Sequence, residues 1–503
     1  MKKAQVKAYA LVLALLVGGL VGCGTKNSST SSSQQSQNES SQTSSQSTET
    51  VKSVNIKFWH TFGQTVKESL ETKAETFKQL VKTNDGVDVS FEFSYQGSYD
   101  DIATKITNGF TVGNRPTIAV AYPDNVADYL NIGKASGEEF VVNLDKFIND
   151  SSIGFGKEAW LGDTHDEEDF VQDFYSEGSR YNTPGTYSIP LMKSTEIMFY
   201  NKELLNKAMA YFKPELVGQT EKIDKYMKDI SWDDFIALSN AIVAHKDQFP
   251  NMEVPFCYDS DANFFITQLF QREIPYASID NNGAGQILFD GDNLAATTSF
   301  LEEVYDAYHN GLFTTKGVKG TYGSDFFTGE KCVFSIGSSG GSGYNFPQSE
   351  AFELGVCRVP AANDNPVYVS QGPTLALFNS TGLTPEVNSA TLKYAWKFLK
   401  YVTNAAVNVD LCVNGSEGYV PVRYSAYETA QFLEFVDAGE EYAKCYKVVV
   451  NDIDDYLVTD AFKGSAELRD QCGILLTGVC NAKDKNSIPG LIDQAVRNAK
   501  LKF

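Results

Sequence analysis

The chain has 503 residues, of which 64 are Asp or Glu and 42 are Lys or Arg, so its formal net charge at neutral pH is −22. Negative charge on this scale excludes an electrostatic role on nucleic acid or on anionic lipid. Hydrophobic residues make up 42% of the chain, and its length exceeds what a single core serves, so two or more lobes are expected.

The N-terminus has the layout of a secretory signal. Lys2, Lys3 and Lys7 precede an apolar run over residues 8–21, and small residues then lead to Cys23. The run is shorter than the roughly 20 residues that a membrane-spanning helix needs. The stretch Leu-Val-Gly-Cys at residues 20–23 resembles the bacterial lipobox, in which the cysteine receives a diacylglycerol. We therefore predict a lipoprotein signal peptide over residues 1–22 and lipidation of Cys23.

A low-complexity segment follows the predicted anchor. From residue 27 to residue 50 every residue is Ser, Thr, Gln or Asn, except Glu39 and Glu49. Such a composition cannot form a core. As a flexible coil the segment spans roughly 25 to 30 Å. We predict that residues 23–50 are a lipid-anchored, Ser/Thr/Gln-rich linker.

The folded part opens with alternating strand and helix patterns. Residues 54–59 and 87–93 alternate apolar and polar side chains, which is typical of strands, and residues 66–81 carry apolar side chains at helical spacing. A helix is expected over residues 101–110 and a short buried strand over residues 117–122. Strands alternating with helices predict an α/β fold with a parallel sheet.

A second α/β region begins near residue 188. A strand is expected around residues 197–200, with a helix from residue 202. Ser231 favours a helix start as an N-cap, and Trp232 beside it is expected to pack rather than to serve as a ligand platform. Later helices are expected over residues 295–308, 390–402 and 487–500.

Neither the cysteines nor the acidic patches predict a metal site or a cofactor. Besides Cys23 an odd number of cysteines remains, which cannot all pair within one chain, and Cys332 and Cys357 lie in apolar runs that favour buried thiols. Residues 163–169 are expected to form a solvated acidic loop, and residues 280–283 do not fit the calcium-loop spacing. The remaining cysteines are Cys257, Cys332, Cys357, Cys412, Cys445, Cys472 and Cys480.

Several segments, in order along the chain, resemble family 1 of the extracellular solute-binding proteins, which includes the maltose-binding and glycerol-3-phosphate-binding proteins. Their order and spacing cover nearly all of the chain after the linker. The segments are Ile-Lys-Phe-Trp-His at 56–60, Tyr-Gln-Gly-Ser-Tyr at 95–99, Ile-Pro-Leu at 189–191, Phe-Tyr-Asn-Lys at 199–202, Trp-Asp-Asp-Phe at 232–235, Phe-Thr-Gly-Glu-Lys at 327–331 and Gly-Tyr-Val-Pro-Val at 418–422.

The resemblance implies a two-lobed, type II periplasmic-binding-protein-like fold with the ligand cleft between the lobes. It implies that the chain crosses between lobes near Pro190, near Gly337 and over residues 402–408. Lobe 1 is then expected to comprise residues 51–189 and 337–402. Lobe 2 is expected to comprise residues 190–336 and 403–503.

Candidate ligand contacts on the first lobe follow the strands, because ligands of open α/β sheets bind outside the carboxyl ends of strands. Sugars need aromatic platforms edged by polar groups. A turn or packing role is the alternative at each position. The candidates are His60, Thr61, Phe62, Tyr95, Gln96, Ser98, Tyr99 and Tyr122.

Further candidates lie at the expected crossings. The glycine-dense stretch over residues 335–344 offers backbone N–H groups to a phosphate or a sugar, and it could equally serve as a hinge. Arg423 could clamp an anion; if it pairs instead with an acidic residue, the ligand is expected to be neutral. The candidates are Ser194, Thr195, Ser338, Ser339, Gly340, Gln371, Gly372 and Arg423.

The resemblance implies a monomeric substrate-binding lipoprotein of an ABC importer, not an enzyme. It would sit on the extracytoplasmic face of the cell membrane, capture a carbohydrate such as an oligosaccharide by lobe closure, and deliver it to permease subunits. The alternatives are a protein that binds glycerol 3-phosphate or a glycerophosphodiester, and a lipoprotein that acts as a sensor or adhesin rather than in transport. A secreted glycoside hydrolase would need two carboxylates flanking the scissile bond, and no segment suggests such a pair.

Overall fold

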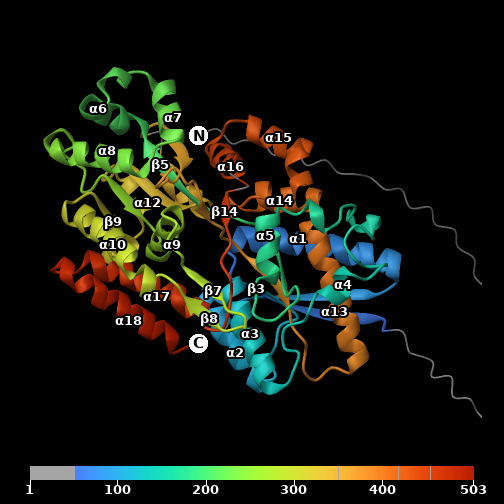
Figure 1. Cartoon of the computed structure of the whole chain (residues 1–503). Coiled ribbons are helices and arrows are strands. Elements are labelled where there is room, and N and C mark those ends of the chain that lie inside the picture. The colour runs from blue at the N-terminus through green and yellow to red at the C-terminus, as the bar shows by residue number, and fades with distance from the viewer. Residues whose placement is uncertain (1–50, 349–350, 417, 452, 454) are drawn as a thin grey trace, which may run out of the picture. The chain divides into compact units, whose positions relative to one another are not determined.

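The computed structural model describes residues 51–348, 351–416, 418–451, 453 and 455–503 (Figure 1). The predicted signal peptide (residues 1–22), the lipidation of Cys23 and the linker (residues 23–50) lie outside these residues. No helix in the described part of the chain is both long and apolar enough to cross a bilayer.

The first sheet is built from the strands predicted at the start of the folded part. In β1 the buried side chains alternate with exposed ones at first and then become continuous, which fits a strand covered on both faces at its carboxyl end. Strands β1, β2 and β3 are parallel, and β13 enters antiparallel between β3 and β4. The order is β2 (Asp88–Tyr95), β1 (Ser53–His60), β3 (Ile118–Ala121), β13 (Thr374–Leu377) and β4 (Ser188–Pro190).

Helices α1 (Gln64–Asp85) and α2 (Tyr99–Val112) connect these parallel strands. α1 ends at Gly86, whose φ of 72° is the left-handed conformation that glycine adopts without strain. α2 starts with a capping box, in which the Ser98 hydroxyl accepts from the Asp101 N–H and the Asp101 carboxylate accepts from the Ser98 N–H. The predicted β-α-β-α-β start is therefore confirmed.

The second sheet also contains both parallel and antiparallel strands. Strand β5 runs antiparallel to β10 and β11, whereas β10, β6 and β9 are mutually parallel. Trp232 at the start of α8 (Trp232–Ala244) packs edge-on against Phe256 and is 6% exposed, so the packing role predicted for it is confirmed. The order is β11 (Leu354–Arg358), β5 (Glu196–Asn201), β10 (Phe334–Ser338), β6 (Phe256–Tyr258) and β9 (Phe313–Thr315).

The other helices cover the two sheets. In Figure 1, α17 and α18 lie beside α9 and α10 of the second sheet, and α13 lies beside α1 of the first, as their contacts also show. The helices are α3 (Pro123–Ser136), α4 (Asp145–Ile148), α5 (Gln172–Ser176), α6 (Lys202–Phe212), α7 (Thr220–Lys228), α8 (Trp232–Ala244), α9 (Asp261–Gln271), α10 (Leu294–His309), α11 (Lys316–Lys319), α12 (Gly323–Thr328), α13 (Pro385–Thr403), α14 (Ala405–Gly415), α15 (Ala430–Asp437), α16 (Glu441–Asn451), α17 (Ser465–Cys480) and α18 (Ile488–Lys500).

Two short strand pairs complete the fold. β7 (Ala277–Ile279) and β8 (Gly285–Ile287) form an antiparallel hairpin. Its turn is held by the Asp280 carboxylate, which accepts from the N–H groups of Asn282 and Ala284. β12 (Tyr368–Val369) and β14 (Tyr456–Leu457) pair in parallel.

Three segments run side by side between the two sheets. Lys193 and Val420 exchange backbone hydrogen bonds of 3.0 and 2.7 Å, and Ser194 and Gln371 exchange bonds of 3.0 and 2.9 Å. The first segment follows Pro190 and leads to β5, and the second leads from β11 to β13. The third, which contains Val420, leads from α14 toward α15 and α16.

The predicted lobe boundaries differ from the sheets at two points. β11 pairs with β5, so the chain stays with the second sheet to Arg358 and does not leave it near Gly337. The glycine-dense stretch forms a 3-10 turn after β10 rather than a crossover. α13 and α14 both contact α1, so no crossing occurs over residues 402–408.

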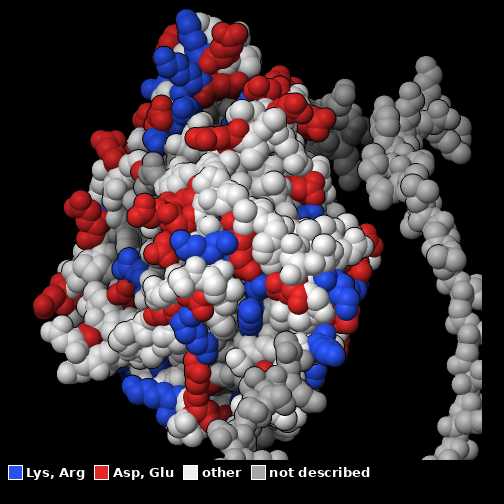
Figure 2. Space-filling view, turned by 90° about the vertical axis from the view of Figure 1, so that its right-hand side faces the viewer, with Lys and Arg blue, Asp and Glu red and all other residues white. Residues whose placement is uncertain are grey.

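The described cysteines are buried as predicted, whereas the acidic loop over residues 163–169 differs from its prediction. The cysteines of the described residues are free, buried thiols. Figure 2 shows acidic and basic side chains interspersed over one face of the molecule. The acidic loop over residues 163–169 is not fully solvated. Asp163 is 1% exposed and pairs with Lys400 at 3.0 Å, because a buried ammonium needs carboxylate partners.

Candidate functional site

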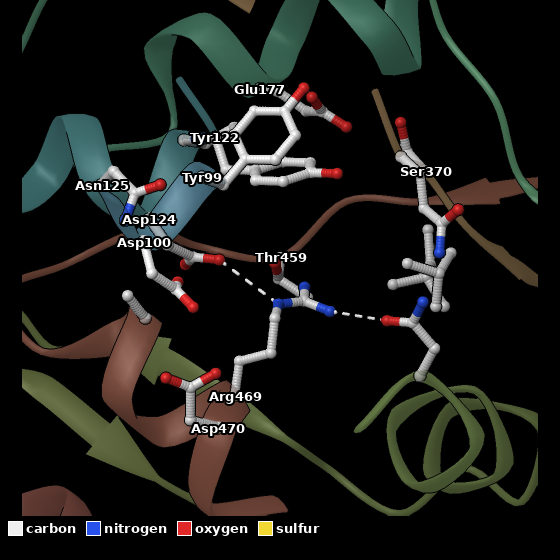
Figure 3. A pocket seen from close by; sticks show the side chains of 16 residues that line it. Tyr99, Asp100, Tyr122, Asp124, Asn125, Glu177, Ser370, Thr459, Arg469 and Asp470 are labelled. Atoms are coloured by element: carbon white, nitrogen blue, oxygen red, sulfur yellow. Dashed lines mark hydrogen bonds and ion pairs between the residues drawn. The ribbon is translucent and has the colours of Figure 1, made fainter. Parts of the chain in front are cut away.

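A cavity of about 230 Å³ lies where the end of the first sheet meets α17. Figure 3 shows two tyrosine rings on one side and an arginine reaching in from α17. Clefts lined by aromatic rings and a few convergent polar groups are the usual sites for small molecules. Its lining includes Tyr99, Asp100, Tyr122, Asp124, Glu177, Asn263, Ser370, Gln371, Thr459, Arg469 and Asp470.

The two tyrosines form one aromatic platform. Tyr99 is the first residue of α2 and Tyr122 follows β3, and their ring centroids are 4.3 Å apart with 40° between the planes. Burial raises the pKa of both phenols, so both remain neutral. Thr61 hydrogen-bonds Tyr99, and the Gly372 backbone hydrogen-bonds Tyr122, so both rings are held in place.

Arg469 joins the two sides of the cavity. Its Nη1 donates to Asn263 Oδ1 at 3.0 Å, and its Nε lies 3.4 Å from Asp124 Oδ2 (Figure 3). Asp124 is in the first turn of α3, beside the first sheet, whereas Asn263 is on α9, beside the second. Ser465, at the start of α17, also donates to Asp124, at 2.6 Å.

A second contact reinforces this junction. The Gly464 N–H donates to Asp128 Oδ1 on α3 at 2.9 Å. Gly464 has a φ of 85°, the left-handed conformation that places its N–H ahead of α17. The bonds between α3 and α17 therefore link the layers of the two sheets beside the cavity.

The acidic groups around the cavity differ in how they are compensated. Glu177 forms a buried ion pair with Lys193. Burial raises the pKa of Glu196 to about 8, and its carboxyl is hydrogen-bonded by Tyr258 and by Asn263. Partial desolvation, and then the charge of Asp100, raise the pKa of Asp470 to about 6.

The structure places five of the predicted contacts at or beside this cavity. Tyr99, Tyr122 and Gln371 line it directly, and Thr61 lies behind Tyr99. Gly372 holds Tyr122, and its φ of 106° brings its backbone close to Met192, where a side chain would collide.

Other predicted contacts hold the crossing segments together. The Thr195 hydroxyl donates to Val369 O at 2.9 Å, and Ser339 Oγ accepts from the Thr195 N–H at 3.2 Å. The Ser338 hydroxyl lies 3.4 Å from that of Ser194. Gly340 faces the ring of Tyr419, which leaves no space for a Cβ. None of these five predicted contacts (Ser194, Thr195, Ser338, Ser339 and Gly340) lines the cavity.

The residues around the end of β1 also point elsewhere. His60 is fully buried, its Nδ1 accepts from the Phe62 N–H, and burial lowers its pKa to about 4. Gln96 hydrogen-bonds Ser94, Ser98 caps α2, and Tyr95 is 62% exposed without lining the cavity. These positions serve turns and packing, the alternative that the sequence left open.

Arg423 is not placed to clamp a ligand. It is 1% exposed; its guanidinium donates to the carbonyls of Thr403 at 2.8 Å and Asp166 at 2.9 Å, and it lies 3.4 Å from Asp169. The guanidinium also stacks 3.9 Å from the centroid of Phe170. The prediction of an anion clamp is therefore wrong, because the sequence does not show the acid that takes this charge.

The residues that sequence reasoning missed are mostly polar. Asp100 directly follows the predicted contact Tyr99, and Asp124 comes two residues after the predicted contact Tyr122, so the rule for strand ends found residues close to both. Arg469 and Asp470 lie on a helix far along the chain, and no local pattern marks them. The described residues contain no group of three or more His, Cys, Asp or Glu that could hold a metal ion.

Comparison with known proteins decides the family. The model of the bacterial extracellular solute-binding protein family matches residues 74–438. The chain belongs to this family. Solute-binding proteins of this kind act outside the cytoplasm, bind small molecules, sugars among them, and work with ABC permeases. No protein of curated function matches the chain.

Solved structures of other solute-binding proteins share the two-lobed fold. The GacH receptor of Streptomyces glaucescens, solved unliganded and with acarbose, is 17% identical, with a TM-score of 0.60 and coverage of 90% of this chain and 99% of that one. The cyclic alpha-maltosyl-1,6-maltose binding protein of Arthrobacter globiformis is 18% identical, with a TM-score of 0.64 and coverage of 89% and 99%. UgpB of Mycobacterium tuberculosis, solved with glycerophosphocholine, is 15% identical, with a TM-score of 0.61 and coverage of 89% and 98%.

Proposed function

We propose that this solute-binding protein is the lipid-anchored receptor of an ABC importer, and that it captures a carbohydrate, an oligosaccharide in the first instance, in the cavity beside Tyr99 and Tyr122. The observation that carries the proposal is the tyrosine pair with polar groups from both sheets around it. Sugar rings present apolar faces edged by hydroxyls, which such a platform and such polar groups complement.

The mechanism that we propose is closure around the ligand. A carbohydrate on the tyrosine platform is also reached by Asn263 and Arg469 beside the second sheet, so it adds contacts that exist only when the two layers are together. A ligand shifts a conformational equilibrium by its differential affinity for the two states. The closed form would then present both lobes to the permease.

Anchoring and oligomeric state belong to the same proposal. Cys23 would carry the lipid, and residues 23–50 would tether a monomeric receptor to the extracytoplasmic face of the membrane. Labelling with a radioactive or alkyne fatty acid should mark the wild-type chain, and Cys23→Ser should remove the label. A labelled Cys23→Ser variant would contradict lipidation at this position.

An anionic solute fits the cavity less well. Four carboxylates line it, whereas the one lining guanidinium, that of Arg469, is already bonded to Asp124 and Asn263. Glycerol 3-phosphate or a glycerophosphodiester would place its phosphate among these acids, where like charges repel.

A thermal-shift screen of the purified protein tests the proposal. The panel should hold mono- and oligosaccharides, glycerol 3-phosphate and glycerophosphocholine, with calorimetry on every hit. A ligand at about 100 times its dissociation constant raises the free energy of unfolding by about 2.7 kcal/mol. A carbohydrate hit that is recovered intact supports capture, release of a cleaved sugar would point to a hydrolase, and a hit with phosphates alone would contradict the carbohydrate assignment.

A deletion strain separates transport from sensing. Loss of carbohydrate uptake supports the importer role. Normal uptake with altered signalling or attachment would support the sensor or adhesin alternative instead.

A further inference from the structure

Two carboxylates in the cavity have no cation of their own. Asp100 is in the first turn of α2, beside the first sheet, and Asp470 is on α17, beside the second (Figure 3). Both line the cavity, and the negative charge of Asp100 acts on Asp470. Both side chains are exposed, and across the described residues neither one forms an ion pair with a Lys, Arg or His.

The other charged groups of the cavity are already compensated. Glu177 is paired with Lys193, and Asp124 accepts from Ser465 and lies beside Arg469. The Arg469 charge also reaches Asp470, but its donors are directed to Asp124 and Asn263. The cavity therefore keeps an excess of negative charge at the place where the two layers meet.

A positive group on the ligand would complete this arrangement. Bringing two like charges together is unfavourable, and a cation between them converts repulsion into two attractions. The faces of Tyr99 and Tyr122 also favour a cation, because the ring quadrupole attracts positive charge. Closure of the layers would then depend on the cation that Asp100 and Asp470 share.

We propose that the carbohydrate carries a protonated amino group, and that Asp100 and Asp470 hold this group between the two layers. The inference rests on the proposed carbohydrate capture and specifies its substrate class. It assigns Asp100 and Asp470 as the residues that determine specificity, and the tyrosine platform as the general sugar contact.

Matched pairs of sugars test the inference. Each pair has the same length and linkage and differs only in an amine in place of a hydroxyl, as in β-1,4-linked glucosamine and glucose oligomers; several linkages and lengths should be covered by calorimetry at neutral pH. The amine member of the pair that binds should bind about tenfold tighter or more, which is the size of one charge-assisted hydrogen bond. Added salt should reduce the preference.

Variants assign the preference to the two acids. Asp470→Asn and Asp100→Asn should each bring the affinity ratio of amine to hydroxyl sugar closer to one. Asp292→Asn is the matched control, because it removes the same charge from an exposed residue that does not line the cavity, and it should keep the wild-type ratio.

Each outcome decides between the two proposals. Equal binding of both members, or tighter binding of the hydroxyl member, would overturn the amine inference and leave carbohydrate capture standing. An amine preference that survives both variants would overturn the assignment of Asp100 and Asp470. Absence of binding by every carbohydrate in the panel would overturn the proposed function itself.

Discussion

Arg423 gives the sharpest test of how the crossing region is built. Replacement by Met keeps much of the side-chain volume over Phe170 and removes every donor. The carbonyls of Thr403 and Asp166 then lose their partner, and Asp169 loses its cation. Removing one member of a buried ion pair costs about 3 to 5 kcal/mol.

The remaining bonds of Asp169 place the effect within that range. Its carboxylate still accepts from the Ser425 N–H at 2.9 Å and from the Ser425 hydroxyl at 2.6 Å, so it is not left without partners. We therefore expect Arg423→Met to lower the free energy of unfolding by about 3 kcal/mol, at the lower end for buried pairs.

Urea unfolding followed by circular dichroism measures this change. For a chain of this length, the free energy of unfolding falls by about 3 kcal/mol or more per molar urea. The variant should therefore unfold at a midpoint urea concentration that is lower by up to about 1 M. Arg497→Met is the matched control, because Arg497 pairs with Asp493 on the exposed face of α18, and an exposed pair contributes about 1 kcal/mol or less. Unchanged stability together with weaker ligand binding would refute the reasoning and return Arg423 to the ligand site.

Three further predictions concern the cavity and its surroundings. Tyr122→Ala should weaken carbohydrate binding about tenfold in calorimetry, because an aromatic contact is lost. Tyr322→Ala, at an exposed tyrosine outside the cavity, should leave binding unchanged. Equal effects of the two variants would contradict the role of the tyrosine platform. Arg469→Met should weaken binding and enlarge the radius of gyration of the liganded protein in small-angle scattering, since the bonds to Asp124 are lost, and an unchanged radius would count against this junction. Glu196 has a pKa of about 8 in the folded state and ionises near 4.5 when unfolded, so the free energy of unfolding should fall as pH rises from about 5 to about 8. Glu196→Gln should remove part of that fall. Identical pH profiles of the variant and the wild type would show that Glu196 is ionised in the fold.

The fold was largely predictable because its signals are local. The alternation in β1 and β2 and the spacing of Leu70, Ala74 and Phe77 in α1 are set by burial of one face, which the sequence records directly. The route of the chain between the sheets was not predictable in the same way. β11 is an edge strand whose pairing with β5 depends on residues about 150 positions away.

The candidate site was predictable to the same extent as the fold: the contacts that follow a local pattern were found, and those made by distant segments were missed. Tyr99 and Tyr122 follow strands of the first sheet, so the rule for strand ends found them. Arg469 and Asp470 reach the cavity only because α17 packs against α9 and α3, a contact between distant segments. Arg423 is the opposite case, a residue that was predicted to contact the ligand but does not. Its charge suggested an anionic ligand, but its guanidinium pairs with Asp169.

A calorimetric titration of the purified protein with the best carbohydrate from the screen tests the central claim most directly. Capture in the proposed cavity predicts a single binding site, an intact sugar at the end of the titration, and a negative heat-capacity change as apolar surface is buried against Tyr99 and Tyr122. The absence of binding by any carbohydrate, or binding that is unchanged when Tyr99 and Tyr122 are both replaced by Ala, would contradict it.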